Sequence, residues 1–254
     1  MPNYIGLSTL VRREFKRTAM TINQVVWPPI ITTLLFLFIF GVGLSARIKT
    51  LNGVPYLEFL LPGLVMMNVI SSSYDESSSS LFQQRFMMSI QEVLIAPLSY
   101  FEMLIGFLTG SLLRGVVIGC LVMGIGLIVV HAGPSNIPVF SFFMFVTALL
   151  FSSIGMIGGL IAKTFDNLAI VTTFIITPLT YVGGVFSSIH LLPPLLQQIS
   201  LFNPMLYMVD GLRYSYTGVA DISPGIDAVV VSVLAVIAFS VAYWMTKKGV
   251  NLRV

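Results

Sequence analysis

Long uninterrupted apolar runs are the feature of this sequence that most restricts its fold. Residues 30–43 and 115–130 are two such runs, and neither contains a charged residue. Only 9% of the 254 residues are charged, against about 25% in a soluble domain, and the mean hydropathy is +0.96. Most of the chain must therefore lie in hydrocarbon, where backbone polar groups are satisfied only within helices or closed barrels. Barrel strands alternate apolar and polar residues, so the continuous runs predict an all-α integral membrane protein.

The apolar runs predict six transmembrane helices within a single membrane domain that covers residues 1–254. We expect them over residues 25–44, 56–82, 101–130, 138–161, 168–186 and 225–245. Pro28 and Pro29 lie near the start of the first helix, where a missing N–H is tolerated. Residues 1–20 do not resemble a cleavable signal peptide, so we expect the first span to direct insertion.

An amphipathic helix in the membrane interface is predicted for residues 4–19. The apolar side chains share one arc of a helical wheel: Tyr4, Leu7, Leu10, Val11 and Phe15. The basic side chains lie largely opposite: Arg12, Arg13, Lys16 and Arg17. A disordered basic tail is the alternative, and the apolar periodicity argues against it.

The second predicted span contains an unusual polar run. Residues 71–80 comprise seven serines, one tyrosine, Asp75 and Glu76. Either the helix stops at Ile70, which leaves barely enough length to cross ~30 Å of hydrocarbon, or it continues to Phe82 with its polar face hidden from lipid. We favour continuation.

The distribution of basic residues predicts the orientation. Nine of them fall on one side of the predicted spans: Arg12, Arg13, Lys16, Arg17, Arg85, Lys163, Lys247, Lys248 and Arg253. The other side holds Arg47, Lys49 and Arg213, whereas Arg114 lies within a span. Because cytoplasmic loops are enriched in Lys and Arg, both termini are expected in the cytoplasm.

Residues 187–222, on the outer side, are too apolar for a solvated loop. Pro193, Pro194 and Pro204 divide them into two helical pieces, each too short to cross the membrane. The pattern predicts a re-entrant helical hairpin that dips into the outer leaflet. A seventh span is the weaker alternative.

The sequence offers no recognisable catalytic, metal or nucleotide site. His131 and His190 are isolated at helix ends, the single Cys120 lies in an apolar run, and the ten carboxylates are dispersed. No lysine follows a glycine-rich phosphate loop. Although the net charge is +3, the basic residues are scattered at helix ends, so we expect membrane orientation rather than nucleic-acid binding to explain them.

Ionisable residues at membrane depth are the best candidates for a site, because each is costly there unless it is buried in protein or hydrated. We expect Asn68, Ser72, Asp75, Glu76 and Arg114 to border a polar translocation path. A structural ion pair or a hydrated helix end is an equally weighted interpretation of the same residues.

Several segments resemble the ABC-2 permease family. They are residues 163–166, 177–186, 192–194 and 203–207. Pro204, Tyr207 and Arg213 fit the outer signature of that family, whereas Val182 departs from it slightly. The likeness extends over essentially the full chain. It is strongest to the YadH-like branch, which also includes permeases similar to exporters of nodulation lipo-oligosaccharides.

The resemblance implies a division of labour between subunits. Residues 83–99 look like a cytoplasmic coupling segment seated on a separate ATPase, with a second small contact at residues 163–167. The candidate coupling residues are Arg85, Glu92, Pro97, Lys163 and Asp166. Two permeases would pair with two ATPases in the bacterial inner membrane, with ATP and Mg on the ATPases and no cofactor on this chain. Surrounding membrane lipids are the remaining expected partners.

These expectations lead to one leading hypothesis and two rivals. The leading hypothesis is the permease of an ATP-driven exporter for an amphipathic, lipid-linked or drug-like molecule. The Asp75–Glu76 pair is not part of the family pattern, so the likeness implies no particular cargo. An ion-coupled secondary transporter would instead use Asp75, Glu76 and Arg114 as a relay. A membrane-embedded transferase is the third possibility, and it requires a reactive cluster.

Overall fold

A computed structural model describes residues 3–44, 50–51 and 53–252. The predicted outer residues Arg47 and Lys49 and the C-terminal Arg253 lie outside this range. The described chain is helical apart from turns and a short antiparallel pair, β1 (Thr50–Leu51) and β2 (Val54–Pro55). Six of its helical segments are long and apolar enough to cross a membrane, as predicted.

The helices follow one another along the chain with short connections. The first helices are α1 (Tyr4–Met20), α2 (Ile22–Phe38) with the π-helical turn η1 (Ile39–Leu44), α3 (Tyr56–Phe86), α4 (Ile90–Ile95), α5 (Tyr100–Val130) and α6 (Ile137–Ile161). The fifth candidate membrane span comprises α7 (Phe165–Val171), η2 (Thr172–Ile176), α8 (Thr177–Thr180) and η3 (Tyr181–Val185). The chain then forms η4 (Ile189–Leu191), α9 (Pro194–Leu201), α10 (Pro204–Thr217) and α11 (Pro224–Lys248).

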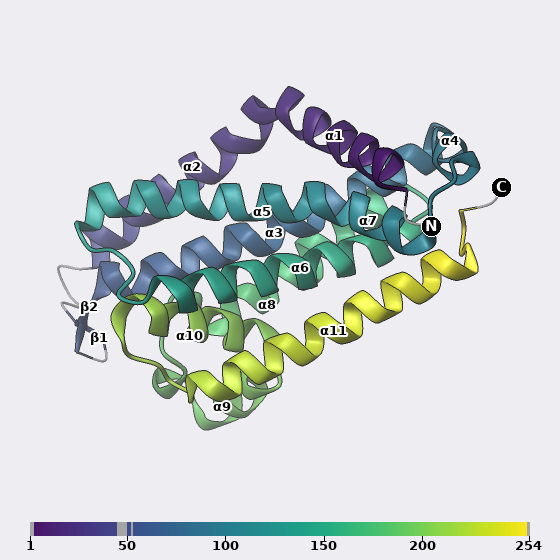
Figure 1. The fold of residues 1–254 in the computed structure, drawn as a ribbon. Coiled ribbons are helices and arrows are strands. Elements are labelled where there is room, and N and C mark those ends of the chain that lie inside the picture. Colours follow the sequence, from purple (N-terminus) through teal and green to yellow (C-terminus); the bar gives the residue numbers. More distant parts are fainter. Residues whose placement is uncertain (1–2, 45–49, 52, 253–254) are drawn as a thin grey trace.

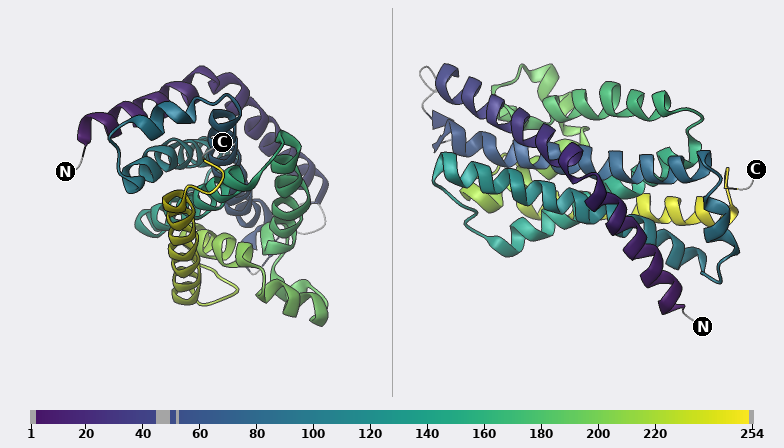
Figure 2. Two further views of the ribbon diagram at one scale, coloured as in Figure 1. Left: turned by 90° about the vertical axis from the view of Figure 1, so that its right-hand side faces the viewer. Right: turned by 90° about the horizontal axis from the view of Figure 1, so that it is seen from above.

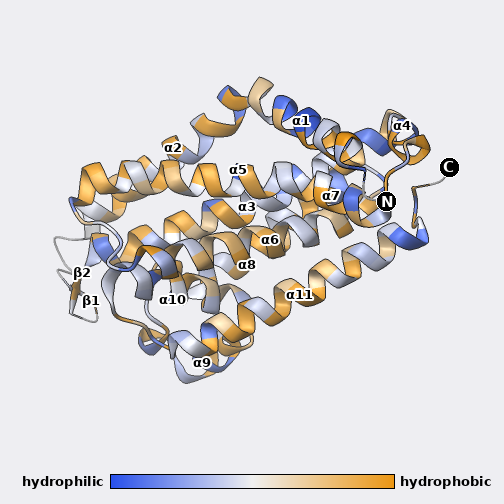
Figure 3. Ribbon diagram, in the orientation of Figure 1, coloured by the Kyte–Doolittle hydropathy of each residue, from blue (hydrophilic) through white to orange (hydrophobic). Residues whose placement is uncertain are grey.

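The long helices run side by side, so the bundle has two distinct ends (Figure 1). Both termini and α4 lie at one end, here called the terminal end, whereas β1, β2, α9 and α10 lie at the opposite, hairpin end. Helix α1 crosses the outside of the bundle obliquely (Figure 2) and packs on α5. Apolar residues predominate along α5, α6 and α11, whereas α1 is conspicuously hydrophilic (Figure 3).

Helix α3 is the centre of the bundle, and it continues through the serine run without a break. It packs mainly against α5 and α6, and small residues line these contacts. A Cβ at Gly155 would lie 2.5 Å from the carbonyl oxygen of Tyr74, and one at Gly159 would lie 2.8 Å from that of Ser78. Because serine and glycine allow the helices to approach closely, the run is buried in protein. The alternative in which the helix ends at Ile70 is wrong.

Two short helices occupy the region between the fifth and sixth spans. Helix α9 has 8 residues and α10 has 14, and both are shorter than the ~20 residues that a span needs. Helix α9 leaves apolar side chains such as Leu195, 69% exposed, on the surface, whereas α10 is buried against α3, α6 and α11. The predicted pair of short pieces is therefore present, and its insertion into the outer leaflet stays a prediction.

Candidate functional site

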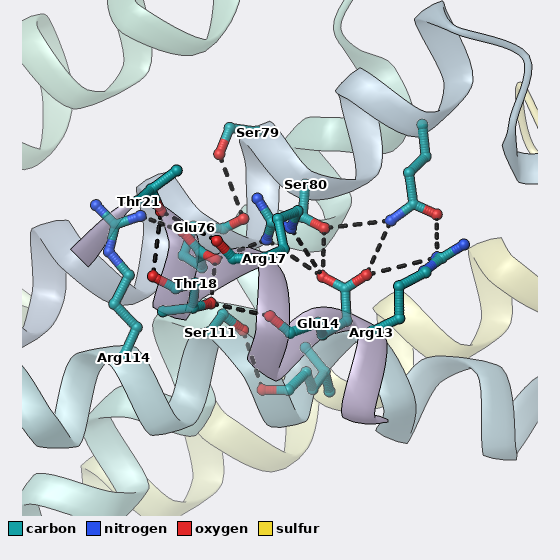
Figure 4. Close-up of polar contacts among 12 residues, drawn as sticks. Arg13, Glu14, Arg17, Thr18, Thr21, Glu76, Ser79, Ser80, Ser111 and Arg114 are labelled. Atoms are coloured by element: carbon teal, nitrogen blue, oxygen red, sulfur yellow. Dashed lines mark hydrogen bonds and ion pairs between the residues drawn. The ribbon is translucent and has the colours of Figure 1, made fainter. Parts of the chain in front are cut away.

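A cluster of charged side chains joins α1 to α3 and α5 (Figure 4). Glu76 of α3, only 1% exposed, accepts hydrogen bonds through Oε1 from Arg17 Nη2 at 2.6 Å and from Thr18 Oγ1 at 2.7 Å. Its Oε2 pairs with Arg114 Nη1 of α5. This ion pair joins α3 to α5. A buried carboxylate with several charged donors is compensated for the loss of water.

A second buried carboxylate extends the cluster toward the terminal end. Glu14 of α1 accepts hydrogen bonds from Ser80 Oγ at 2.7 Å and Gln84 Nε2 at 3.0 Å on α3. It also lies 3.2 Å from Arg17 Nη2 and 3.5 Å from Arg13 Nη2. We name the five charged residues the ion cluster: Arg13, Glu14, Arg17, Glu76 and Arg114. With three arginines against two glutamates, it carries one excess positive charge.

Helix α1 contacts the bundle through residues of both its predicted faces, and its position in the membrane interface stays a prediction. Leu10 of the predicted apolar arc is buried, but Tyr4 and Phe15 of that arc are 73% and 56% exposed. Arg17, assigned to the polar side, turns inward to reach Glu76. Glu14 and Arg17 were missed as site residues. The available signal was an i, i+3 Glu–Arg pair, in which Glu14 is the only acid of a basic helix.

Asp75 points away from the ion cluster although it is the neighbour of Glu76. Its Oδ1 accepts a hydrogen bond from Thr172 Oγ1 of η2 at 2.8 Å. Asn68, one turn from Ser72, donates through Nδ2 to Thr33 Oγ1 of α2 at 3.4 Å. Because residues i, i+4 and i+7 share one helix face, Asn68, Ser72 and Asp75 form a polar stripe between α2 and η2. The five predicted pathway residues thus fall into two groups rather than one.

Aromatic rings pack where α2 and the fifth span meet toward the hairpin end. The Phe186 ring lies 5.3 Å from Phe36 and 5.2 Å from Phe40, centroid to centroid. Tyr56 contacts Phe40 at 6.4 Å, and its hydroxyl donates to the Phe186 carbonyl at 3.0 Å. We name Phe36, Phe40, Tyr56 and Phe186 the aromatic cluster. It lies on the hairpin side of the polar stripe, so the polar surface between α2 and the fifth span ends at these rings.

The candidate coupling residues lie at the terminal end, and they differ in what they contact. Arg85 donates to the carbonyl oxygens of Asn251 at 2.8 Å and Ala162 at 3.3 Å, and also to that of Gly159. It therefore joins the ends of α3 and α6 to the C-terminal turn. The other four are exposed at α4 or at the turn into α7: Glu92, Pro97, Lys163 and Asp166.

Hydrogen bonds connect α1 to the turn that follows α4. Asn3 Nδ2 donates to the Pro97 carbonyl at 3.2 Å, and the Asn3 backbone N–H donates to Glu102 Oε1 at 2.6 Å. Glu102 also accepts from Ser99 and completes a capping box at the start of α5. At the terminal end, the turn after α4 is therefore joined to α1, and α1 carries three residues of the ion cluster: Arg13, Glu14 and Arg17.

The residues of the outer signature have structural contacts at the hairpin end. Pro204 is the first residue of α10, and Tyr207 donates to the Leu201 carbonyl at 2.7 Å. Arg213 is 2% exposed, lies 3.6 Å from Asp210 Oδ1, and bonds the carbonyl oxygen of Gly184. Its guanidinium also stacks 3.7 Å from the centroid of the Phe59 ring. We name Asp210, Arg213 and these contacts the outer cluster.

None of these groups forms a reaction centre. Within residues 3–44, 50–51 and 53–252, there is no group of three His, Cys, Asp or Glu side chains that could hold a metal ion. The polar groups instead connect helices to one another.

Comparison with known proteins gives this architecture a family. The family model described as ABC-2 type transporter matches residues 6–217. The inner membrane transport permease YadH of Escherichia coli strain K12 is 37% identical over 251 residues, which cover 98% of each chain. Nodulation protein J of Rhizobium leguminosarum bv. viciae is 24% identical over 192 residues, 72% of this chain and 71% of its own. The Rhizobium meliloti protein of that name is 23% identical over 214 residues, 81% of this chain and 79% of its own. This chain therefore belongs to the ABC-2 type transporter family, as a non-catalytic membrane permease of the kind that pairs with ATPase subunits.

Proposed function

We propose that the chain is the permease of an ATP-driven exporter in the bacterial inner membrane, with both termini in the cytoplasm. Its cargo is an amphipathic, lipid-linked or drug-like molecule that leaves the cytoplasm or the inner leaflet. The observation that carries this proposal is the polar stripe of Asn68, Ser72 and Asp75, which lies between α2 and η2 within an apolar bundle. A polar head group finds hydrogen-bond partners there, and apolar chains find the surfaces of the flanking helices.

A second copy of the chain completes the path in this proposal. The two helices that flank the stripe expose large apolar side chains, among them Trp27 and Phe38 on α2 and Phe174 on η2, which are 59%, 66% and 72% exposed. Only 17% of the first candidate span is buried within one chain. Pairing two copies along these faces encloses the two polar stripes and removes them from lipid.

The contacts at the terminal end suggest how an ATPase drives the change. The ATPase contacts α4 and residues 163–167, through Glu92, Lys163 and Asp166. When the turn at Pro97 moves, its hydrogen bond with Asn3 displaces α1. The ion cluster then moves α3 and α5 together with α1. Movement of α2, α3 and the fifth span then separates the aromatic cluster and opens the path outward.

The test is ATP-dependent export by the chain reconstituted in vesicles with its ABC ATPase partner, using a fluorescent lipid-linked sugar as the probe. We expect Asp75→Asn to lower export roughly tenfold, the effect of one lost charged hydrogen bond, while ATPase binding is unchanged. Lys248→Gln, which removes a charge at the exposed end of α11, is the matched control. Vanadate should stop export.

An ion-coupled transporter predicts a different outcome. Transport that follows a proton gradient, ignores vanadate and persists without the ATPase would contradict our proposal. That mechanism needs Asp75, Glu76 and Arg114 as one relay, whereas Asp75 bonds Thr172 and Glu76 bonds Arg17 and Arg114. Among the described contacts, no hydrogen bond or ion pair joins Asp75 to the side chain of Glu76 or Arg114 to complete that relay.

A further inference from the structure

An apolar groove runs along the outer side of the ion cluster. It encloses about 220 Å³ between the end of α1, the first turns of α2 and the middle of α5. Its lining is almost entirely apolar: Phe15, Thr18, Ala19, Ile22, Val25, Val26, Leu113, Arg114, Val117 and Ile118. Phe15, Ile22 and Val117 are 56%, 50% and 41% exposed, so the groove is open to the surroundings of the bundle.

The groove is flanked by positive charge. Arg114 lines it directly, and its Nε is buried without a hydrogen-bond partner in the described residues. The ion cluster behind the groove has one more arginine than glutamate, and Arg12 and Lys16 are exposed on the neighbouring flank of α1. Helix α1 leads into the first candidate span, so these cations lie where an interface passes into hydrocarbon.

We propose that this groove binds an anionic phospholipid of the surrounding bilayer. One acyl chain lies along Ile22, Val25 and Val117, and the phosphate lies beside Arg114 and the exposed cations of α1. A phospholipid with net negative charge complements the excess positive charge, whereas a zwitterionic one offers no net charge. A second copy of the chain does not fit the site, because it would bring a like-charged cluster against this one. The exported cargo is assigned elsewhere, since the polar stripe faces α2 and η2 rather than this groove.

The single cysteine of the chain offers a direct probe. Cys120 is exposed on α5, two positions beyond Ile118. We would attach a fluorophore there and reconstitute the full chain in phosphatidylcholine vesicles that contain an equal small fraction of nitroxide-labelled phosphatidylglycerol or phosphatidylcholine. We expect phosphatidylglycerol to associate ~fivefold more strongly, the factor of about one cation near a membrane surface. A label placed instead on α11, in Cys120→Ser with Val229→Cys, should show no such preference.

Three variants locate the effect. Arg12→Gln with Lys16→Gln leaves the ion cluster intact and should reduce the preference, and Arg114→Gln should remove it. Ala19→Phe replaces an exposed side chain of the lining, leaves every cation in place, and should reduce quenching at Cys120 by closing the groove. Equal quenching by the two lipids in the unmodified chain would overturn the proposal. So would a preference that survives both Arg114→Gln and Ala19→Phe, because the anionic lipid would then bind elsewhere.

Discussion

Two arginines, one buried at the hairpin end and one partly buried in the middle of α5, are held in different ways. Arg213 at the hairpin end has a 2% exposed side chain, one carboxylate partner, a carbonyl oxygen and an aromatic ring. Arg114, toward the terminal end, is 19% exposed and pairs with Glu76, which also bonds Arg17 and Thr18 of α1. The first set of contacts joins α3, η3 and α10, all packed within the bundle. The second set includes α1, which lies on its outside.

The contrast separates a permanent contact from one that depends on the position of a helix. The partners of Arg213 belong to elements that are buried on several sides, and any displacement leaves a charge without water or partner. Two of the three partners of Glu76, Arg17 and Thr18, are on α1, whose polar side chains remain partly hydrated. The ion cluster therefore responds to a displacement of α1, whereas the outer cluster keeps the hairpin end intact while the terminal end moves.

The largest expected effect is that of Arg213→Met. It leaves Asp210 buried without its cation and removes the stacking on Phe59, so we expect a loss of ~3 kcal/mol or more in stability and little folded protein. Thermal unfolding in detergent measures the change. Lys248→Met, on a cation that stacks on Trp244 at the exposed end of α11, is the control and should leave stability within about 0.5 kcal/mol.

The double variant Arg213→Met with Asp210→Asn tests whether the uncompensated charge of Asp210 causes the loss of stability. Removing both charges should recover part of the lost stability, because a buried carboxylate without its cation causes most of the loss, although Asp210 keeps its hydrogen bonds from the backbone N–H groups of Asp221 and Ile222. If the double variant is no more stable than the single one, Arg213 acts through packing rather than through its charge.

The fold was largely predictable because hydrocarbon allows few solutions. Continuous apolar runs and flanking basic residues are local properties of the sequence, and they indicated the six candidate spans. Continuation of the second span through residues 71–80 was a choice between alternatives, since serines have low helix propensity. Tertiary packing, which is not a local property, keeps this segment helical. Gly115 on α5 and Gly155 and Gly159 on α6 make room for those serines.

The site was predictable as a set of residues but not as an arrangement. Asp75 and Glu76 are adjacent in sequence, yet one residue turns a helix by about 100°, so they face different neighbours. Which neighbours these are depends on tertiary packing that periodicity does not contain. Glu14 and Arg17 escaped notice for the same reason, because a helical wheel assigns charged residues to water unless a partner such as Glu76 is known.

The next effect in size is that of Glu76→Gln. It leaves Arg17 and Arg114 without their shared carboxylate, but both arginines are partly hydrated, so we expect a smaller loss of ~2 kcal/mol. The loss should shrink at about 1 M salt, where screening acts over ~3 Å, whereas that of Arg213→Met should not. Thermal unfolding of both variants at low and high salt measures this. Equal salt dependence of the two losses would contradict the distinction between the clusters.

A weaker effect is expected from Asn3→Ala at the start of α1. Asn3 accepts a hydrogen bond from Gly6 N as the N-cap, and its amide donates to Pro97. Loss of an N-cap costs ~1 kcal/mol, and here it also releases α1 from the turn after α4. We expect export to fall more than stability does, with ATPase activity retained. Ser8→Ala, whose hydroxyl bonds only Ile5 within α1, is the matched control.

The smallest effect on stability should come from Glu92→Gln, and this makes it the sharpest test of the terminal end. Glu92 is exposed on α4, and its side chain makes no hydrogen bond or ion pair within the described part of the chain, so the free energy of unfolding should change by less than about 0.5 kcal/mol. If the ATPase binds α4, the Glu92→Gln variant should copurify less ATPase and show less ATP-dependent export. Asp166→Asn at the second contact should act in the same direction. If the combined variant Glu92→Gln with Asp166→Asn still binds the ATPase and exports normally, the ATPase contacts other residues. In that case α4 does not begin the proposed movement that runs through Asn3 to the ion cluster.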